Sequence, residues 1–330
     1  MIGLLKILTQ RLPKNHNVLV LGDAVLGAQL RTQGFSVLGS VQGTMNNSRT
    51  LGNRMRRAVQ AVTTKKDQLI AWGWTSTVAV SGIGSVHKSI VYVDSIDATK
   101  IPTLEVDCVI PTTWTCGQRI KENNSNLEVT EPLVGVDTKS LVVDHLSVVQ
   151  TLNIKKKNLL VAVVNDVGKW EEIVSFVVQM KALGEDVTVV VSKNYLCFAE
   201  LHFSLQEHGL TNSLRQVTDP LRLIDVAYAA TFIWAPTSTV NGKLEGVLDL
   251  LSASASGVPV AAARNHAIAG VPTIGNRIAW VSSVSDLSAW VMGVLDKTKD
   301  MTDQDLGIAT RLRSFASPTR FVEGFQLRLQ

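Results

Sequence analysis

Short apolar runs alternate with longer stretches of helical spacing along the whole chain. In the first half the apolar runs are bounded by Gly, Asn, Asp and Ser, as strands are. We expect strands at 17–22, 35–41, 68–72, 89–94 and 106–110, all in one sheet. The segment 46–62 has helical spacing and carries several arginines, which we expect on a solvated face. Strands that alternate with helices are typical of an α/β fold with parallel sheets.

The same alternation starts again after a polar, turn-rich segment, KENNSN, at 121–126. The predicted strands are now 159–164, 187–191, 215–217, 231–235, 258–262 and 278–281. Predicted helices at 171–183, 198–208, 221–229 and 245–256 separate them. Two Rossmann-like halves joined near 135–155 account best for this pattern. The segment 302–330 is expected to be helical, with a break at Ser317-Pro318.

Length and composition describe a globular protein of two domains. Single hydrophobic cores stop growing near about 250–300 residues, and the chain has 330. Its net charge of +4 suits phosphate-bearing ligands or a peripheral membrane contact. Cys108, Cys116 and Cys197 have no framework spacing, so we expect reduced thiols in a cytoplasmic protein. The opening apolar patch is too short to span a membrane and lacks a cleavage site, so no signal peptide is predicted.

One short stretch, LLSASASGVPVAAARN at 250–265, predicts a local structure of its own. Small Ala and Ser side chains on the inner face of a helix let that helix pack closely on a sheet. Gly257 is expected to end the helix at positive φ, because it has no Cβ to clash. Pro259 follows where the chain stops being helical, and the apolar run 258–262 enters the sheet. By these rules alone the stretch is a helix stop followed by a buried strand.

The order of landmarks resembles that of the GT-B glycosyltransferases, particularly the retaining glycogen-synthase-like and sucrose-synthase-like group. VDCVIPTTWTCGQRI (106–120) resembles the last strand of the N-domain, followed by a hydroxyl residue that opens a helix. PLVGVD (132–137) is similar to the turn at which the family's chain crosses between its domains. DVAYAATFIWAPT (225–237) is similar to the helix–strand unit at the donor site, and the stretch 250–265 is similar to the segment that follows this unit. The resemblance implies two Rossmann-like domains that face each other across a cleft. It implies an acceptor-side domain at 1–138, a nucleotide-sugar domain at 139–310, and a helix at 311–330 that crosses back to the N-domain.

The resemblance also implies donor-site residues, and the chain departs from the family pattern at several of them. Two family glutamates fall on Leu244 and Ser252 when the chains are aligned on GVP at 257–259. A slip of one residue would bring Glu245 to the sugar as a catalytic group. Ser252 would bond a ribose hydroxyl more weakly than a carboxylate, or serve as a packed helix serine. The expected contacts with diphosphate and ribose are Lys169, Lys193, Thr237, Ser238, Thr239, Ser252 and Arg264.

The two lysines and the acceptor-side residues each have a simpler alternative. Lys169 and Lys193 follow predicted strand ends, where ligands bind in open α/β sheets, or are plain surface residues. On the acceptor side the resemblance points to Gly22, Asp23, Asp94, Trp74 and Trp114. Asp94 is a candidate catalytic base, or the cap of a turn, and Asp23 is equally explained as a helix N-cap. The two tryptophans either line the cleft or pack in the core.

The sequence thus predicts a glycosyltransferase-like protein that moves a sugar from a nucleotide-diphosphate donor to a glycan or lipid-linked acceptor. The rival is a non-catalytic GT-B protein that binds a carbohydrate or a partner, because both family acids and a diphosphate-binding Arg are missing. A nucleotide-sugar epimerase is a third, weaker interpretation. No metal, no other cofactor and no nucleic acid is expected. The basic tail at 311–330 packs as a helix or, less favoured, meets the inner face of a membrane.

Overall fold

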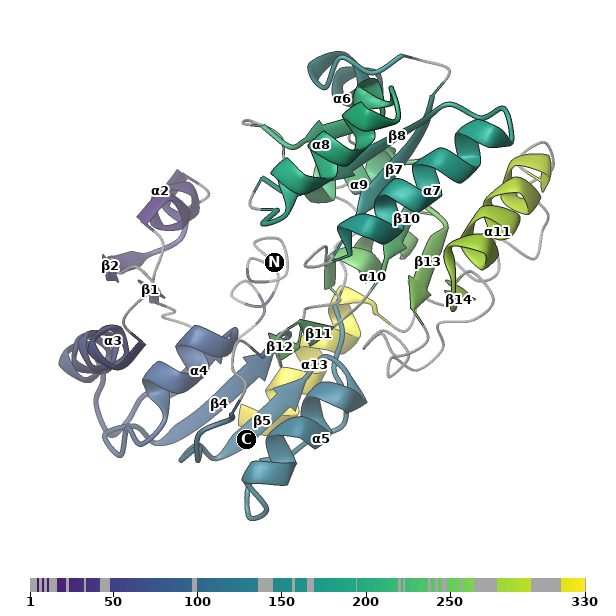
Figure 1. Cartoon of the computed structure of the whole chain (residues 1–330). Helices are drawn as coiled ribbons and strands as arrows, with labels where there is room; N and C mark the ends of the chain where they lie inside the picture. The colour runs from purple at the N-terminus through teal and green to yellow at the C-terminus, as the bar shows by residue number, and fades with distance from the viewer. Residues whose placement is uncertain are drawn as a thin grey trace. The chain divides into compact units, whose positions relative to one another are not determined.

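A computed structural model of the chain divides it into two compact units (Figure 1). Unit 1 comprises Met1–Gly135, Gly242–Leu244 and Ala316–Gln330, and unit 2 comprises Val136–Asn241 and Glu245–Phe315. The structure describes residues 5, 8, 11, 17–21, 24–32, 34–41, 48–96, 100–135, 145–155, 158–164, 169–193, 195–218, 221, 223–236, 239–240, 243–244, 248–255, 257–263, 278–297 and 316–329. The expected domain boundary at 138 lies outside these residues.

Unit 2 is built on a parallel sheet of six strands. In chain order these are β7 (Leu159–Val163), β8 (Val187–Val191), β9 (Leu214–Gln216), β10 (Phe232–Ala235), β13 (Val260–Ala263) and β14 (Ile278–Val281). Their spatial order is β14-β13-β10-β7-β8-β9, and every neighbouring pair is parallel. Numbered from the first strand of the unit, this is the order 3-2-1-4-5-6 of the doubly wound Rossmann fold.

Helices cover both faces of this sheet, and the alternation of side chains along each strand assigns the faces. Val161 and Val163 belong to the core cluster that includes Ile173 and Phe176 of α7, whereas Leu160 and Ala162 point to the other face. The first face carries α7 (Trp170–Ala182), α8 (Phe198–Glu207) and α11 (Val284–Lys297), which pack side by side. The remaining elements are α6 (His145–Thr151), α9 (Leu223–Ala229), α10 (Leu248–Ala255) and a short 3₁₀ helix at Thr211–Ser213. Burial on both faces explains why these strands read as nearly continuous apolar runs.

Unit 1 contains two parallel sheets within the described residues. One consists of β1 (Val18–Leu21) and β2 (Val37–Val41), and the other has the order β3-β4-β5-β6. These last strands span Gln68–Trp72, Lys88–Val93, Cys108–Pro111 and Glu128–Val129. The helices are α2 (Ala24–Thr32), α3 (Ser48–Val62), α4 (Trp74–Val80) and α5 (Trp114–Asn123). The expectation of one continuous first sheet was wrong for the described part of the chain, because no ladder joins β1 or β2 to β3.

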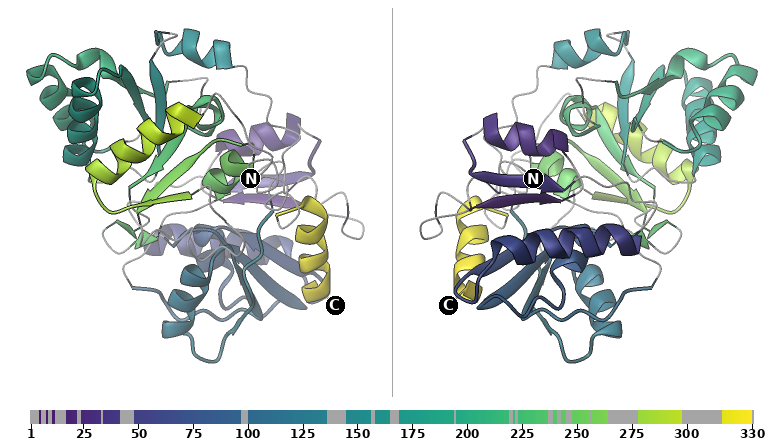
Figure 2. Two further views of the ribbon diagram at one scale, coloured as in Figure 1. Left: turned by 90° about the vertical axis from the view of Figure 1, so that its right-hand side faces the viewer. Right: turned by 90° about the vertical axis from the view of Figure 1, so that its left-hand side faces the viewer.

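The last helix of the chain, α13 (Pro318–Leu329), belongs to unit 1 and begins at the proline where the sequence predicts a break. Figure 2 shows this helix, in yellow, alongside the unit 1 strands in both views. Phe321 and Phe325 are buried against Trp72 of β3 and Tyr92 of β4, with ring centroids 5.4 to 6.4 Å apart. Gly324 lies against Leu133 so closely that a Cβ would meet the Leu133 side chain at 2.7 Å. Aromatic packing, together with the close approach that Gly324 allows, therefore holds α13 against unit 1.

Hydrogen bonds fix both ends of α13 on unit 1. The Arg11 guanidinium donates to the Thr319 hydroxyl over 3.1 Å, and the Gln326 amide donates to the Arg11 carbonyl over 3.1 Å. At the other end Gln68 of β3 donates to the Leu329 carbonyl over 2.8 Å. Two further short strands, β11 (Thr239–Val240) and β12 (Lys243–Leu244), precede α10 in the chain.

Candidate functional site

The carboxyl edge of the unit 2 sheet is the candidate site, because this topology places a reversal of strand order there. Strand order reverses between β7 and β10: the chain leaves β7 toward β8 on one side, and leaves β10 toward β13 on the other. The connections that follow two such strands diverge, and ligands of open α/β sheets bind in the crevice that results. At this point the Val164 amide donates to the Trp234 carbonyl over 2.9 Å, and Ala235 and Pro236 are buried. The edge is thus formed by backbone and small apolar residues.

Helix α10 connects β10 to β13, so its N-terminus faces this carboxyl edge. Unpaired amide groups and the helix dipole make such an N-terminus favourable for an anion.

The C-terminus of α10 ends as the sequence predicts: Gly257 has φ +101°, and its amide donates to the Ser254 carbonyl. The Val258 amide donates to the Ala253 carbonyl, which completes a Schellman motif. Ala253, Ser254 and Ala255 are buried, as expected for a helix that packs closely, and Ser252 is half-buried.

Two lysines lie at the same edge of the sheet. Lys169 immediately precedes α7, which follows β7, and Lys193 is exposed two residues after β8. The Lys169 ammonium forms an ion pair with Glu172, one helical turn further on, with 2.5 Å between Nζ and Oε1. Glu171 is also in the first turn of α7. Lys169 therefore has a carboxylate competitor for any phosphate, a feature that the sequence reasoning missed although the i, i+3 spacing signals it.

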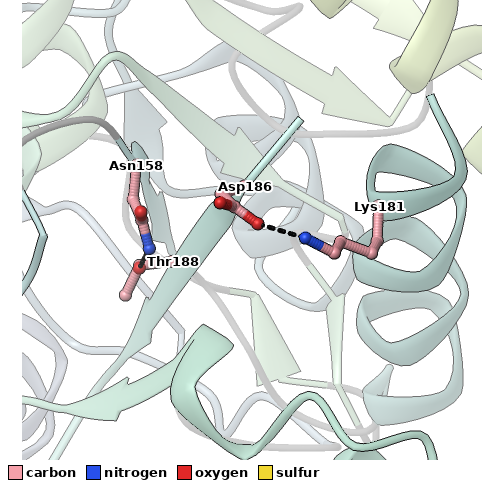
Figure 3. Close-up of polar contacts among 4 residues, drawn as sticks. All are labelled: Asn158, Lys181, Asp186 and Thr188. Atoms are coloured by element: carbon pink, nitrogen blue, oxygen red, sulfur yellow. Dashed lines mark hydrogen bonds and ion pairs between the residues drawn. The ribbon is translucent and has the colours of Figure 1, made fainter. Parts of the chain in front are cut away.

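The opposite edge of the sheet carries a separate set of polar contacts, drawn in Figure 3. Lys181, in the last turn of α7, forms an exposed ion pair with Asp186 over 2.6 Å. The hydrogen bond from Lys181 lowers the pKa of the Asp186 carboxyl below its usual value. Asn158 donates to the buried Thr188 hydroxyl over 2.9 Å and so connects the starts of β7 and β8. These contacts join strands and a helix away from the candidate site.

The carboxyl edge of the β3-β4-β5-β6 sheet of unit 1 holds the acceptor-side candidates that the structure describes. Asp94 follows β4 and is half-buried, and the Thr112 hydroxyl donates to its carbonyl over 3.4 Å. Thr113 caps α5 by accepting from the Cys116 amide over 3.1 Å, which confirms the predicted hydroxyl residue at a helix start. Trp74 is only 7% exposed, so its ring has little surface to offer a sugar, whereas Trp114 is 45% exposed.

The two cysteines of unit 1 are packing residues. Cys116 is buried beside β4, and its thiol donates to the Val93 carbonyl over 3.7 Å. Burial raises the pKa of the Cys116 thiol, and the charge of Asp94 raises it further. Burial likewise raises the pKa of Cys108 to about 11. A thiol is nucleophilic only as a thiolate, so neither group suits nucleophilic catalysis at neutral pH.

Several predicted site residues lie outside the part of the chain that the structure describes. They are Gly22, Asp23, Thr237, Ser238, Glu245 and Arg264. Thr239 is described only as the first residue of β11. Of the predicted donor residues, Lys169, Lys193 and Ser252 are described, and all belong to unit 2. Asp94, Trp74 and Trp114 belong to unit 1.

Within the described ranges, His, Cys, Asp and Glu side chains nowhere gather in groups of three that would hold a metal ion. The helices described there include none of sufficient length and apolar character to cross a membrane.

No protein-family model matches the sequence, and neither does any curated protein. Solved structures do match along nearly the whole chain. A glycosyltransferase from Rickettsia africae is 10% identical with a TM-score of 0.69, over 99% of this chain and 93% of that one. HepE from Anabaena, solved with UDP and glucose, is 12% identical with a TM-score of 0.68, over 99% and 95%. Sucrose-phosphate synthase from Thermosynechococcus elongatus is 14% identical with a TM-score of 0.65, over 93% and 91%.

At these low identities the comparisons show the fold alone. The matched chains are GT-B glycosyltransferases, and the alignments run through both units of this protein. Together with the parallel sheets of both units, they confirm the expected fold class. This chain has the α/β fold of the GT-B glycosyltransferases.

Proposed function

We propose that this protein is a glycosyltransferase that takes a sugar from a nucleotide-diphosphate donor bound at the carboxyl edge of the unit 2 sheet. The observation that carries the proposal is the reversal of strand order between β7 and β10, with the N-terminus of α10 at that edge. A helix N-terminus at such a point of strand reversal suits a diphosphate without a metal ion. HepE, which has the same fold, was solved with UDP-glucose.

Within this proposal the donor residues keep the roles that the sequence suggested. Lys169 and Lys193 contact the diphosphate, Ser252 contacts the ribose, and Glu245 lies near the sugar. Thr237, Ser238, Thr239 and Arg264 complete the donor side, and Gly22, Asp23, Asp94 and Trp114 the acceptor side. The acceptor is a glycan or a lipid-linked sugar, and the second of these would bring the chain to a membrane surface. The four stretches that resemble the retaining glycogen-synthase-like group support retention at the sugar carbon.

A panel of UDP-, GDP-, ADP- and TDP-sugars in thermal unfolding tests donor binding. A ligand at about 100 times its Kd stabilises the folded state by about 2.7 kcal/mol. The expected result is a clear rise in melting temperature with one nucleotide series. If no member of the panel raises the melting temperature, the donor-binding proposal is lost.

Two lysines at opposite ends of α7 provide a matched pair for locating the site. Lys169→Ala removes an ammonium at the carboxyl edge, and Lys181→Ala removes one at the other edge, about 18 Å away at 1.5 Å per helical residue. Each loses one ion pair and one positive charge. Donor affinity should fall in the Lys169 variant and in Lys193→Ala, and stay unchanged in the Lys181 variant. Equal affinity in all three variants would remove these lysines from the site.

One observation favours a second candidate, a GT-B protein that binds a carbohydrate or a partner without catalysis. The start of α7 carries Glu171 and Glu172, and Glu172 already pairs with Lys169. Leu244 and Ser252 stand where the resembled family has acids. Release of free nucleotide from the donor identified in the panel separates the two candidates. Donor binding with no nucleotide release, across a set of glycan and lipid-linked acceptors, would favour the non-catalytic candidate.

A further inference from the structure

The segment between Asp23 and Asp67 has a charge pattern that the proposed function does not use. No Asp or Glu occurs in it, and its charged residues are Arg31, Arg49, Arg54, Arg56, Arg57, Lys65 and Lys66. The chain as a whole carries only +4, so positive charge is concentrated here. The segment includes β2 and α3 of unit 1.

Helix α3 separates this charge from its buried side. Met55 and Val59, one turn apart, are buried in the core of unit 1, and α3 packs against α4. Arg54 and Arg57 are exposed on the opposite side of the helix, together with Gln60 and Ala61. A stripe of this kind, apolar on one side and basic on the other, marks an amphipathic helix.

Among the described residues, no carboxylate pairs with the exposed basic side chains of this surface. Lys65 and Lys66 follow α3 and are exposed, and Asp67 comes next in the chain. The Asp67 carboxylate accepts instead from the amide and the hydroxyl of Thr64, over 2.6 and 2.9 Å. In the part of the chain that the structure describes, no ion pair involves Arg54, Arg57, Lys65 or Lys66.

We propose that this basic α3 surface, formed by Arg54, Arg57, Lys65 and Lys66, binds the anionic headgroups of a lipid bilayer. Lipid headgroups offer dense, mobile negative charge, so separate basic side chains along a helix of about 22 Å meet it without a fixed geometry. Val62, 44% exposed at the end of α3, offers the shallow apolar contact that an interfacial helix makes. A site for single-stranded nucleic acid would combine charge with aromatic side chains on which bases stack. The exposed positions of α3 that the structure describes hold none.

The inference rests on the charge and exposure of α3 and not on the donor site, so the two proposals fail independently. If the proposed function also holds, membrane binding through unit 1 favours a lipid-linked acceptor over a soluble glycan.

Sedimentation with lipid vesicles tests the inference on the full chain. The protein should bind vesicles that contain phosphatidylglycerol, not vesicles of phosphatidylcholine alone, and added salt should release it. One basic side chain near an anionic surface is worth about 1 kcal/mol, or about fivefold in partitioning. The variant Arg54→Ala/Arg57→Ala should therefore bind about 30-fold more weakly. The matched control Lys100→Ala/Lys121→Ala removes two exposed lysines elsewhere in unit 1 and should bind like the parent.

Three outcomes would overturn the inference. The first is no binding to phosphatidylglycerol vesicles, and the second is an equal loss in the α3 variant and in the control, which would indicate net charge alone. The third is displacement from vesicles by short duplex DNA that binds more tightly than the lipid, which would assign the surface to nucleic acid. Unchanged thermal unfolding and circular dichroism of both variants exclude misfolding, since all four substituted side chains are exposed.

Discussion

The packing of α13 against the strands of unit 1 gives a quantitative prediction about the free energy of unfolding. Phe325 is fully buried, and its ring stacks on Trp72 at 6.4 Å and an interplanar angle of 3°. It also contacts the rings of Tyr92 at 5.7 Å and Phe321 at 5.1 Å. Phe325→Ala removes these contacts and leaves a cavity between the helix and two strands. Substitutions of this kind cost about 3–5 kcal/mol, so we expect a loss of roughly 4 kcal/mol in the free energy of unfolding of unit 1.

Urea unfolding followed by hydrogen exchange measures this loss and locates it. With a slope of about 2 kcal/mol per molar urea, the unit 1 transition should move down by about 2 M. Amides of β3 and β4 should lose protection, while those of β7 and β8 in unit 2 should keep it, because the substituted ring belongs to unit 1. Leu327→Ala is the control on the same helix: its side chain is 66% exposed, so the change should be within about 0.5 kcal/mol.

The reasoning would be refuted by either of two results. A loss below about 1 kcal/mol would mean that the aromatic cluster contributes little to the seating of α13. An equal loss of protection in β7 and β8 would mean that the two units unfold together and that α13 does not act on unit 1 alone.

Three further predictions concern other side chains. Glu172→Gln removes the carboxylate that competes for the Lys169 ammonium, so donor nucleotide should bind a few-fold more tightly in calorimetry; weaker binding would contradict the role of Lys169. In the folded protein a thiol reagent should modify Cys197 first, because it is half-buried whereas Cys108 and Cys116 are buried, and mass spectrometry after limited labelling identifies the site. The unfolding free energy should fall between pH 9 and about 11, since the folded state keeps the Cys108 thiol protonated above the pH at which the unfolded chain releases its proton. A Cys108→Ala/Cys116→Ala variant should show a flatter dependence in urea unfolding at these pH values, and an unchanged slope would refute the assignment.

Local structure followed from the sequence because its causes are local. The end of α10 at Gly257 needs only a residue without a Cβ at positive φ, and the cap of α5 needs only a hydroxyl at Thr113. Apolar runs such as 159–163 identify buried parallel strands by composition alone. The fold class could also be predicted, since strands that alternate with helices allow few arrangements. The comparisons confirm it at identities of 10–14%.

The tertiary structure decided what depends on residues distant in the chain. The reversal of strand order between β7 and β10 arises from pairings that no single segment specifies. Trp74 and Trp114 both follow strand ends in the sequence, and only packing makes the first a core residue and the second exposed. Phe325 packs against Trp72 and Tyr92, which lie in strands more than two hundred residues earlier in the chain. Periodicity and capping depend on residues a few positions apart, whereas burial depends on the whole assembled fold. The fold therefore decides which of two similar side chains, such as Trp74 and Trp114, is buried and which is exposed.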